Sequence, residues 1–84
     1  MKHEERTYIG SAEIRLDNIA RRDALVKAAK GAGFLVECNE AISITLSGGS
    51  SPTYWAITVY AQGIIPPTEK REARARLASA WRGL

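Results

Sequence analysis

The stretch from Tyr54 to Ala61 constrains the fold of this chain more than any other. β-branched and aromatic residues dominate it, and such residues fit a pleated, half-buried strand. Side chains alternate between the two faces of a strand, so one face carries an apolar set and the other an amphipathic set. The apolar set is Trp55, Ile57, Val59 and Ala61, and the other set is Tyr54, Thr58 and Tyr60. We therefore expect a strand with one face against the core and one face toward solvent.

Length and composition predict one folded domain over residues 1–84. A chain of this length buries only about 60% of its unfolded surface, so its stability margin is thin. Hydrophobic residues make up 45% and charged residues 25%, which is ordinary for a globular protein with a packed core. We expect flexibility only at residues 1–6.

A first strand is predicted from Thr7 to Leu16. Unbroken alternation puts Tyr8 on the same face as Ile14 and puts Ile9 on the opposite face. The pair Gly10-Ser11 weakens the first half of this strand.

A helix follows the first strand. Asp17-Asn18 offers its N-cap, and the helix is expected to run to about Lys30. Either Gly31 or Gly33 is expected to end it through a left-handed residue. The apolar stripe of this helix consists of Ala24, Leu25, Ala28, Ala29 and Ala32.

The region from Phe34 to Leu46 forms the second β segment, and two interpretations of it stay open. One is a single long strand with a bend or bulge near Asn39-Glu40. The other is a hairpin whose three-residue loop, Asn39 to Ala41, pairs Cys38 with Ile42. Six apolar residues of the region share one parity: Phe34, Val36, Cys38, Ile42, Ile44 and Leu46.

A loop from Gly49 to Pro52 is expected to connect this region to the strand after it. A loop of that length aligns apolar residues of the two segments on one face, which is the unit of sheet stabilisation. The expected pairs are Leu46 with Trp55, Ile44 with Ile57, and Ile42 with Val59.

A second helix is predicted at the end of the chain. Gly63 ends the preceding strand, and Pro67 or Thr68 starts the helix. Apolar residues recur at helical spacing and predict its buried stripe. The stripe consists of Ala73, Leu77, Ala80, Trp81 and Leu84.

The order of elements is strand, helix, one or two strands, strand, helix. This order predicts an α+β fold, a two-layer sandwich of a three- or four-stranded, mostly antiparallel sheet with both helices packed on one face. The residues expected to meet in one core are Leu25, Phe34, Trp55 and Trp81.

No pattern for catalysis, for a metal or for a cofactor stands out. The single histidine, His3, lies in the terminal stretch, and one cysteine with one distant histidine cannot supply a four-ligand zinc site. The Ser47-Gly48-Gly49-Ser50 stretch lacks the Lys that ends a phosphate-binding loop. Cys38 alternates with apolar residues, so we expect a buried, inert thiol. We expect no enzymatic activity.

The sequence favours a cytoplasmic location. A single cysteine suits a reducing compartment, and the chain carries neither a signal-peptide pattern nor an apolar run of the roughly 20 residues that span a bilayer. The net charge of +3 permits contact with nucleic acid or an acidic surface without demanding either.

Without a chemical motif, a docking role is the leading functional hypothesis. The solvent-facing side of the central strand offers Tyr54, Thr58 and Tyr60, and Arg15 is expected on the same face. Tyrosines are favoured in protein interfaces. The partner would be another protein or nucleoprotein complex, and the chain would act as a small regulator or inhibitor of the kind that phages and mobile elements encode. A homodimer through an exposed sheet edge or face is a related alternative.

Nucleic-acid binding is the alternative function. Four basic residues of the last helix, Lys70, Arg71, Arg74 and Arg82, are candidates for phosphate contacts. The tyrosine face could add base stacking. Acidic residues interleave with these cations, which is also typical of an ordinary solvated helix face.

Overall fold

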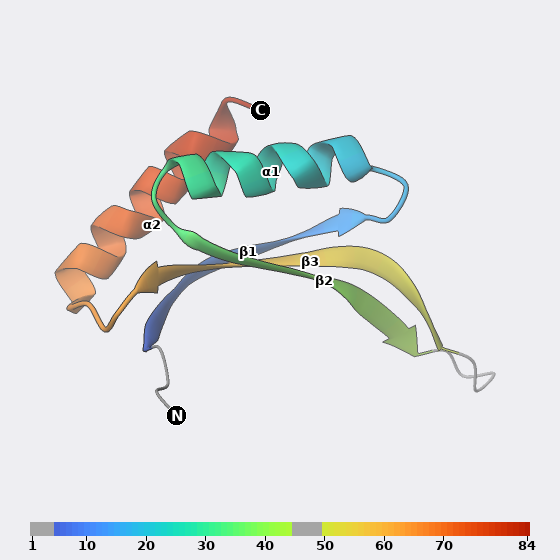
Figure 1. Ribbon diagram of the computed structural model, residues 1–84, viewed down its shortest axis with the longest axis horizontal. Coiled ribbons are helices and arrows are strands. Elements are labelled where there is room, and N and C mark those ends of the chain that lie inside the picture. The colour runs from blue at the N-terminus through green and yellow to red at the C-terminus, as the bar shows by residue number, and fades with distance from the viewer. Residues whose placement is uncertain (1–4, 45–49) are drawn as a thin grey trace.

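The computed structural model describes residues 5–44 and 50–84, which form one sheet and two helices (Figure 1). The three strands make an antiparallel sheet in the order β1-β3-β2, so β3 is central. The predicted α+β class and the predicted order of elements are confirmed, with three strands in the sheet. The elements are β1 (Arg6–Arg15), α1 (Ile19–Gly31), β2 (Leu35–Ile44), β3 (Ser50–Gln62) and α2 (Pro67–Arg82).

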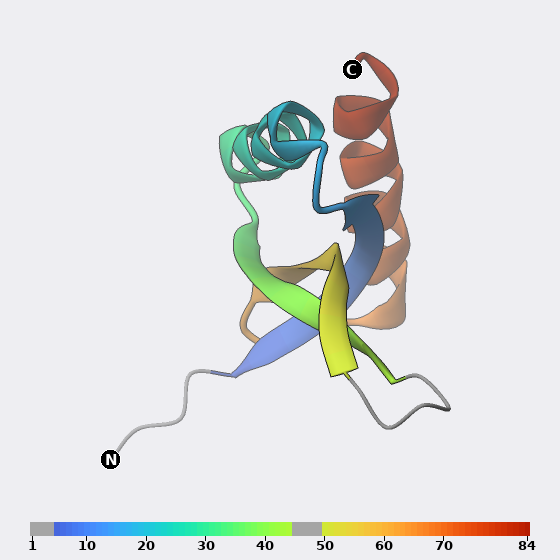
Figure 2. The same cartoon turned by 90° about the vertical axis from the view of Figure 1, so that its right-hand side faces the viewer.

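The helices form a layer on one side of the sheet, above it in Figure 1. Figure 2 shows that they cross, because α1 is seen nearly end-on while α2 runs across the view. The indole Nε1 of Trp81 in α2 donates a hydrogen bond to the carbonyl oxygen of Leu25 in α1, at 2.9 Å. This hydrogen bond links α1 and α2 where they cross.

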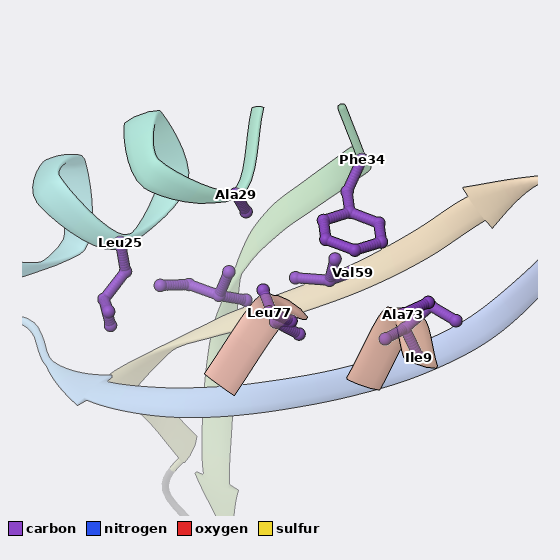
Figure 3. Packing of buried hydrophobic residues seen from close by; sticks show 8 residues of the cluster. Ile9, Leu25, Ala29, Phe34, Val59, Ala73 and Leu77 are labelled. Atoms are coloured by element: carbon purple, nitrogen blue, oxygen red, sulfur yellow. The ribbon is translucent and has the colours of Figure 1, made fainter. Parts of the chain in front are cut away.

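The core lies between the sheet and the helices (Figure 3). Leu25 and Phe34 belong to it, as predicted, and Trp81 packs against it from the rim. Trp55 was wrongly placed in the core: it is half-buried, with the guanidinium of Arg22 4.3 Å from the centroid of its ring. Leu84 is 49% exposed, so it does not extend the buried stripe of α2. The buried residues are Ile9, Leu25, Ala29, Phe34, Ile57, Val59, Ala73 and Leu77.

A β-bulge in β1 overturns the alternation expected there. Tyr8 pairs with Tyr60 and Gly10 pairs with Val59, so Ile9 is an extra residue. Such a residue shifts the side chains that precede it to the other face. Ile9 is therefore buried at 1% exposure, whereas Tyr8 is 46% exposed on the side away from the helices.

The second β region is one long strand, so the first of its two interpretations is confirmed. The irregularity falls between Ala41 and Ile42, just past the expected Asn39-Glu40 position, where Thr53 is an extra residue on β3.

The predicted register between β2 and β3 is wrong. Cys38 pairs with Ile57, and Ile42 pairs with Pro52. In the expected register Cys38 would lie opposite Gly63, where β3 has ended, so the residues of β2 before Cys38 would have no partner on β3. In the observed register β2 is paired from Leu35 onward. Ser50 to Pro52 consequently belong to β3 and not to a loop, while Leu46 and Gly49 lie outside the described residues.

The predicted helix ends are confirmed. The side chain of Asn18 caps α1 by accepting a hydrogen bond from the backbone N–H of Arg21, at 3.2 Å. Gly33 takes the left-handed conformation after α1, with φ of 94°. Pro67 is the first residue of α2, where its missing N–H costs nothing.

Candidate functional site

The sheet surface opposite the helices, here called the outer face, holds the side chains assigned above to partner binding. Residues that pair across neighbouring strands share a face. The outer face therefore consists of five rows: Arg6 and Gln62; Tyr8, Tyr60 and Leu35; Ser11, Thr58 and Glu37; Glu13, Ala56 and Asn39; and Arg15, Tyr54 and Ala41. The structure thus brings Tyr54, Thr58, Tyr60 and Arg15 onto one surface, which none of the described elements covers (Figure 1).

One end of the outer face is a packed aromatic cluster. The rings of Tyr8 and Tyr60 meet edge to face, with centroids 6.2 Å apart and planes at 74°. The guanidinium of Arg6 lies 4.2 Å from the centroid of the Tyr60 ring and also pairs with the carboxylate of Glu37 at 3.0 Å. The hydroxyl of Tyr8 donates to Oγ of Ser11 at 3.0 Å. These contacts fix Tyr60, which is half-buried, in one orientation.

The other end of the outer face is more open. Tyr54 is 43% exposed and pairs in the ladder with Arg15. Arg15 itself is exposed, and its Nε lies 3.5 Å from a carboxylate oxygen of Asp17. Thr58 lies between the two ends and is half-buried. At about 3.3 Å per strand residue, Tyr54 and Tyr60 lie about 20 Å apart.

Sequence reasoning missed three members of the outer face: Arg6, Tyr8 and Glu37. Tyr8 was assigned to the opposite side because the bulge at Ile9 was not foreseen. The weak pair Gly10-Ser11 was the available signal, since glycine within a strand often marks a bulge. Arg6 was expected in a flexible terminus, yet it is the first residue of β1.

The four basic residues predicted for nucleic acid lie on one flank of α2. At 100° per residue, Lys70, Arg71, Arg74 and Arg82 fall within a sector of about 120° around the helix. The acidic residues of α2, Glu69 and Glu72, fall outside that sector. We call these four residues the basic flank.

The members of the basic flank are not equivalent. Nε of Arg74 donates a hydrogen bond to the carbonyl oxygen of Ile9 in the β1 bulge, at 3.3 Å, so Arg74 has a structural partner. Lys70 is half-buried. Arg71 and Arg82 are exposed, and within the described part of the chain the guanidinium of neither makes a hydrogen bond or an ion pair.

A hollow of about 340 Å³ lies between α2 and the end of β3. The guanidinium of Arg76, one of its lining residues, stacks 4.8 Å from the centroid of the Phe34 ring. Glu69 and Glu72 also line the hollow. This hollow is separate from both the outer face and the basic flank.

Cys38 departs from the expectation of a buried thiol. It packs against the core but is half-buried, because β2 is an edge strand. Among residues 5–44 and 50–84, no three His, Cys, Asp or Glu side chains gather as a metal site would require. No helix in the same ranges has the length and apolar character needed to cross a bilayer.

With this geometry in hand, the chain was compared with protein-family models, curated proteins and solved structures. None of them matches it. The outer face and the basic flank are therefore the features that bear on its function.

Proposed function

We propose that this chain is a non-enzymatic binding module that docks on another protein through its outer face. The observation that carries the proposal is a broad, uncovered sheet surface with Tyr8 46% and Tyr54 43% exposed. Tyrosine supplies large contact area at a small cost in rotamer entropy. Contacts of Tyr60 with Tyr8 and Arg6 already hold its ring in place, so binding loses little further side-chain freedom there.

The charges of the outer face favour a protein partner over a polyanion. Arg6 pairs with Glu37, and Arg15 lies beside Asp17, so the cations of this face have acidic neighbours. A nearly neutral aromatic surface resembles the centre of a protein interface, where charged residues are depleted. Such a module acts by covering a surface of its partner, as a small regulator or inhibitor does.

The test compares captured proteins between surface variants. The wild-type chain and the double variant Tyr8→Ala/Tyr54→Ala are immobilised and exposed to nuclease-treated lysate of the native host. A partner retained by wild type should be lost from the double variant, since each buried aromatic anchor contributes about 1 kcal/mol or more.

Ile64→Ala is the matched control, because Ile64 is 74% exposed but lies in the β3–α2 connection. Circular dichroism checks that all three chains are folded. Equal recovery of the partner by the double variant and by the control would contradict docking through the outer face.

A further inference from the structure

Charge is divided unequally between the two layers of the molecule. Helix α1 carries four Lys or Arg and one Asp, and α2 carries five Lys or Arg and two Glu, so each helix has a net charge of +3. The helical layer therefore totals +6, whereas the whole chain is +3, which leaves −3 on the rest. A polyanion that approaches the molecule is therefore attracted to the helical side.

The basic flank concentrates this charge on α2. Arg71 and Arg82 extend from it into solvent, and the residues between them on the same side of the helix, Ala75 and Ala78, are short and exposed. With a rise of 1.5 Å per residue, the two arginines lie about 16 Å apart along the helix axis. Arg74 is held against the β1 bulge, so it adds positive charge from a fixed position.

We propose that the basic flank of α2 binds the phosphate backbone of double-stranded DNA without reading its sequence. An α-helix about 10–12 Å across fits the B-DNA major groove, which is about 12 Å wide, and the alanines leave its outward side thin. Arg71 and Arg82 then reach phosphates that border the groove. The aromatic residue of α2, Trp81, is half-buried against the core and bonded to the Leu25 carbonyl, so the flank offers no free ring for stacking unpaired bases, which favours a duplex over a single strand. This surface is distinct from the outer face, so the chain can hold DNA and a protein at once.

The experiment is a fluorescence-anisotropy titration of a labelled 20-base-pair DNA duplex with the intact chain at several salt concentrations. Affinity should fall as salt rises, with a slope of about −0.9 for each phosphate neutralised. The variant R71Q/R82Q should flatten that slope by about 1.8 and weaken binding at least about tenfold at low salt. Arg74 is left unchanged because it supports the fold.

The control K27Q/K30Q removes the same charge from the exposed side of α1. It should keep the wild-type slope. Equal losses in both double variants would show attraction to net charge only and would overturn the proposal. Undetectable duplex binding by the wild-type chain, or equal affinity for the matching single strand or RNA duplex, would overturn it as well.

Discussion

Gly10 lies where β1 and α2 pack closely together. A Cβ atom built at this position would lie 3.3 Å from Cδ2 of Leu77, which is tighter than ordinary van der Waals contact. Leu77 is buried at 3% exposure, so it has little room to withdraw. The same glycine adjoins the bulge that turns Ile9 into the core, so one small residue sets both the helix–sheet spacing and the facing of β1.

Gly10→Val should therefore destabilise the protein by about 1–3 kcal/mol through overpacking. Urea unfolding followed by circular dichroism measures the change. Gly31→Ala is the matched control, because a Cβ there would meet nothing within 4 Å. Since Gly31 is helical, that change should stabilise the chain by about 0.5–1 kcal/mol. Equal stability of Gly10→Val and wild type would contradict the close approach of α2.

At the scale of elements, local sequence signals predicted the type and the ends of each element better than they predicted how the strands pair. The Asn18 cap, the left-handed Gly33 and the Pro67 start could all be predicted because each depends on one or two residues. Strand register depends on partners distant in sequence, and one extra residue changes it. The bulge at Ile9 did so in β1. Between β2 and β3 the expected register is six residues off, because Val59 pairs with Val36 and not with Ile42. The tyrosines of the central strand were placed on the correct face because β3 has no bulge between Tyr54 and Gln62.

The bond between the helices gives a test at this scale. Trp81→Phe removes the donor to the Leu25 carbonyl and should lower the free energy of unfolding by about 1 kcal/mol. Trp55→Phe is its matched control, because the buried Nε1 of Trp55 has no hydrogen-bond partner within the described residues. Removing an unsatisfied donor costs less than removing a bonded one. Equal destabilisation by the two changes, measured by thermal unfolding, would show that the Trp81 bond contributes nothing.

The whole molecule is more extended than a typical domain of its length. Its radius of gyration over Cα atoms is 14.6 Å. A compact domain of this length has a value of about 12 Å. Its accessible surface is 6128 Å². The usual scaling for monomers of its mass gives about 4,900 Å². The larger surface and the larger radius of gyration both reflect a sheet and a helical layer that do not close into a sphere.

Small-angle X-ray scattering tests the shape and the homodimer alternative together. A monomer of this form should give a radius of gyration near 15 Å that does not change with concentration, because the sheet and helices do not close into a sphere. A value near 12 Å would contradict the extended form. A molecular mass that doubles over the concentration series would make a second copy of the chain the occupant of the exposed surface.

The bulge at Ile9 and the arginine that contacts it restrict growth of the sheet. An added strand pairs with the free backbone groups of an edge. On β1, the Ile9 carbonyl already accepts a bond from Arg74, and the bulge interrupts the regular spacing that a new strand needs. On β2, the exposed carboxylates of Glu37 and Glu40 lie on the edge strand, and charged side chains on an edge disfavour the addition of another strand. Partners are then recognised by side chains and not by backbone pairing at a sheet edge. A chain with this architecture can therefore acquire new partners through successive surface substitutions while its backbone stays the same.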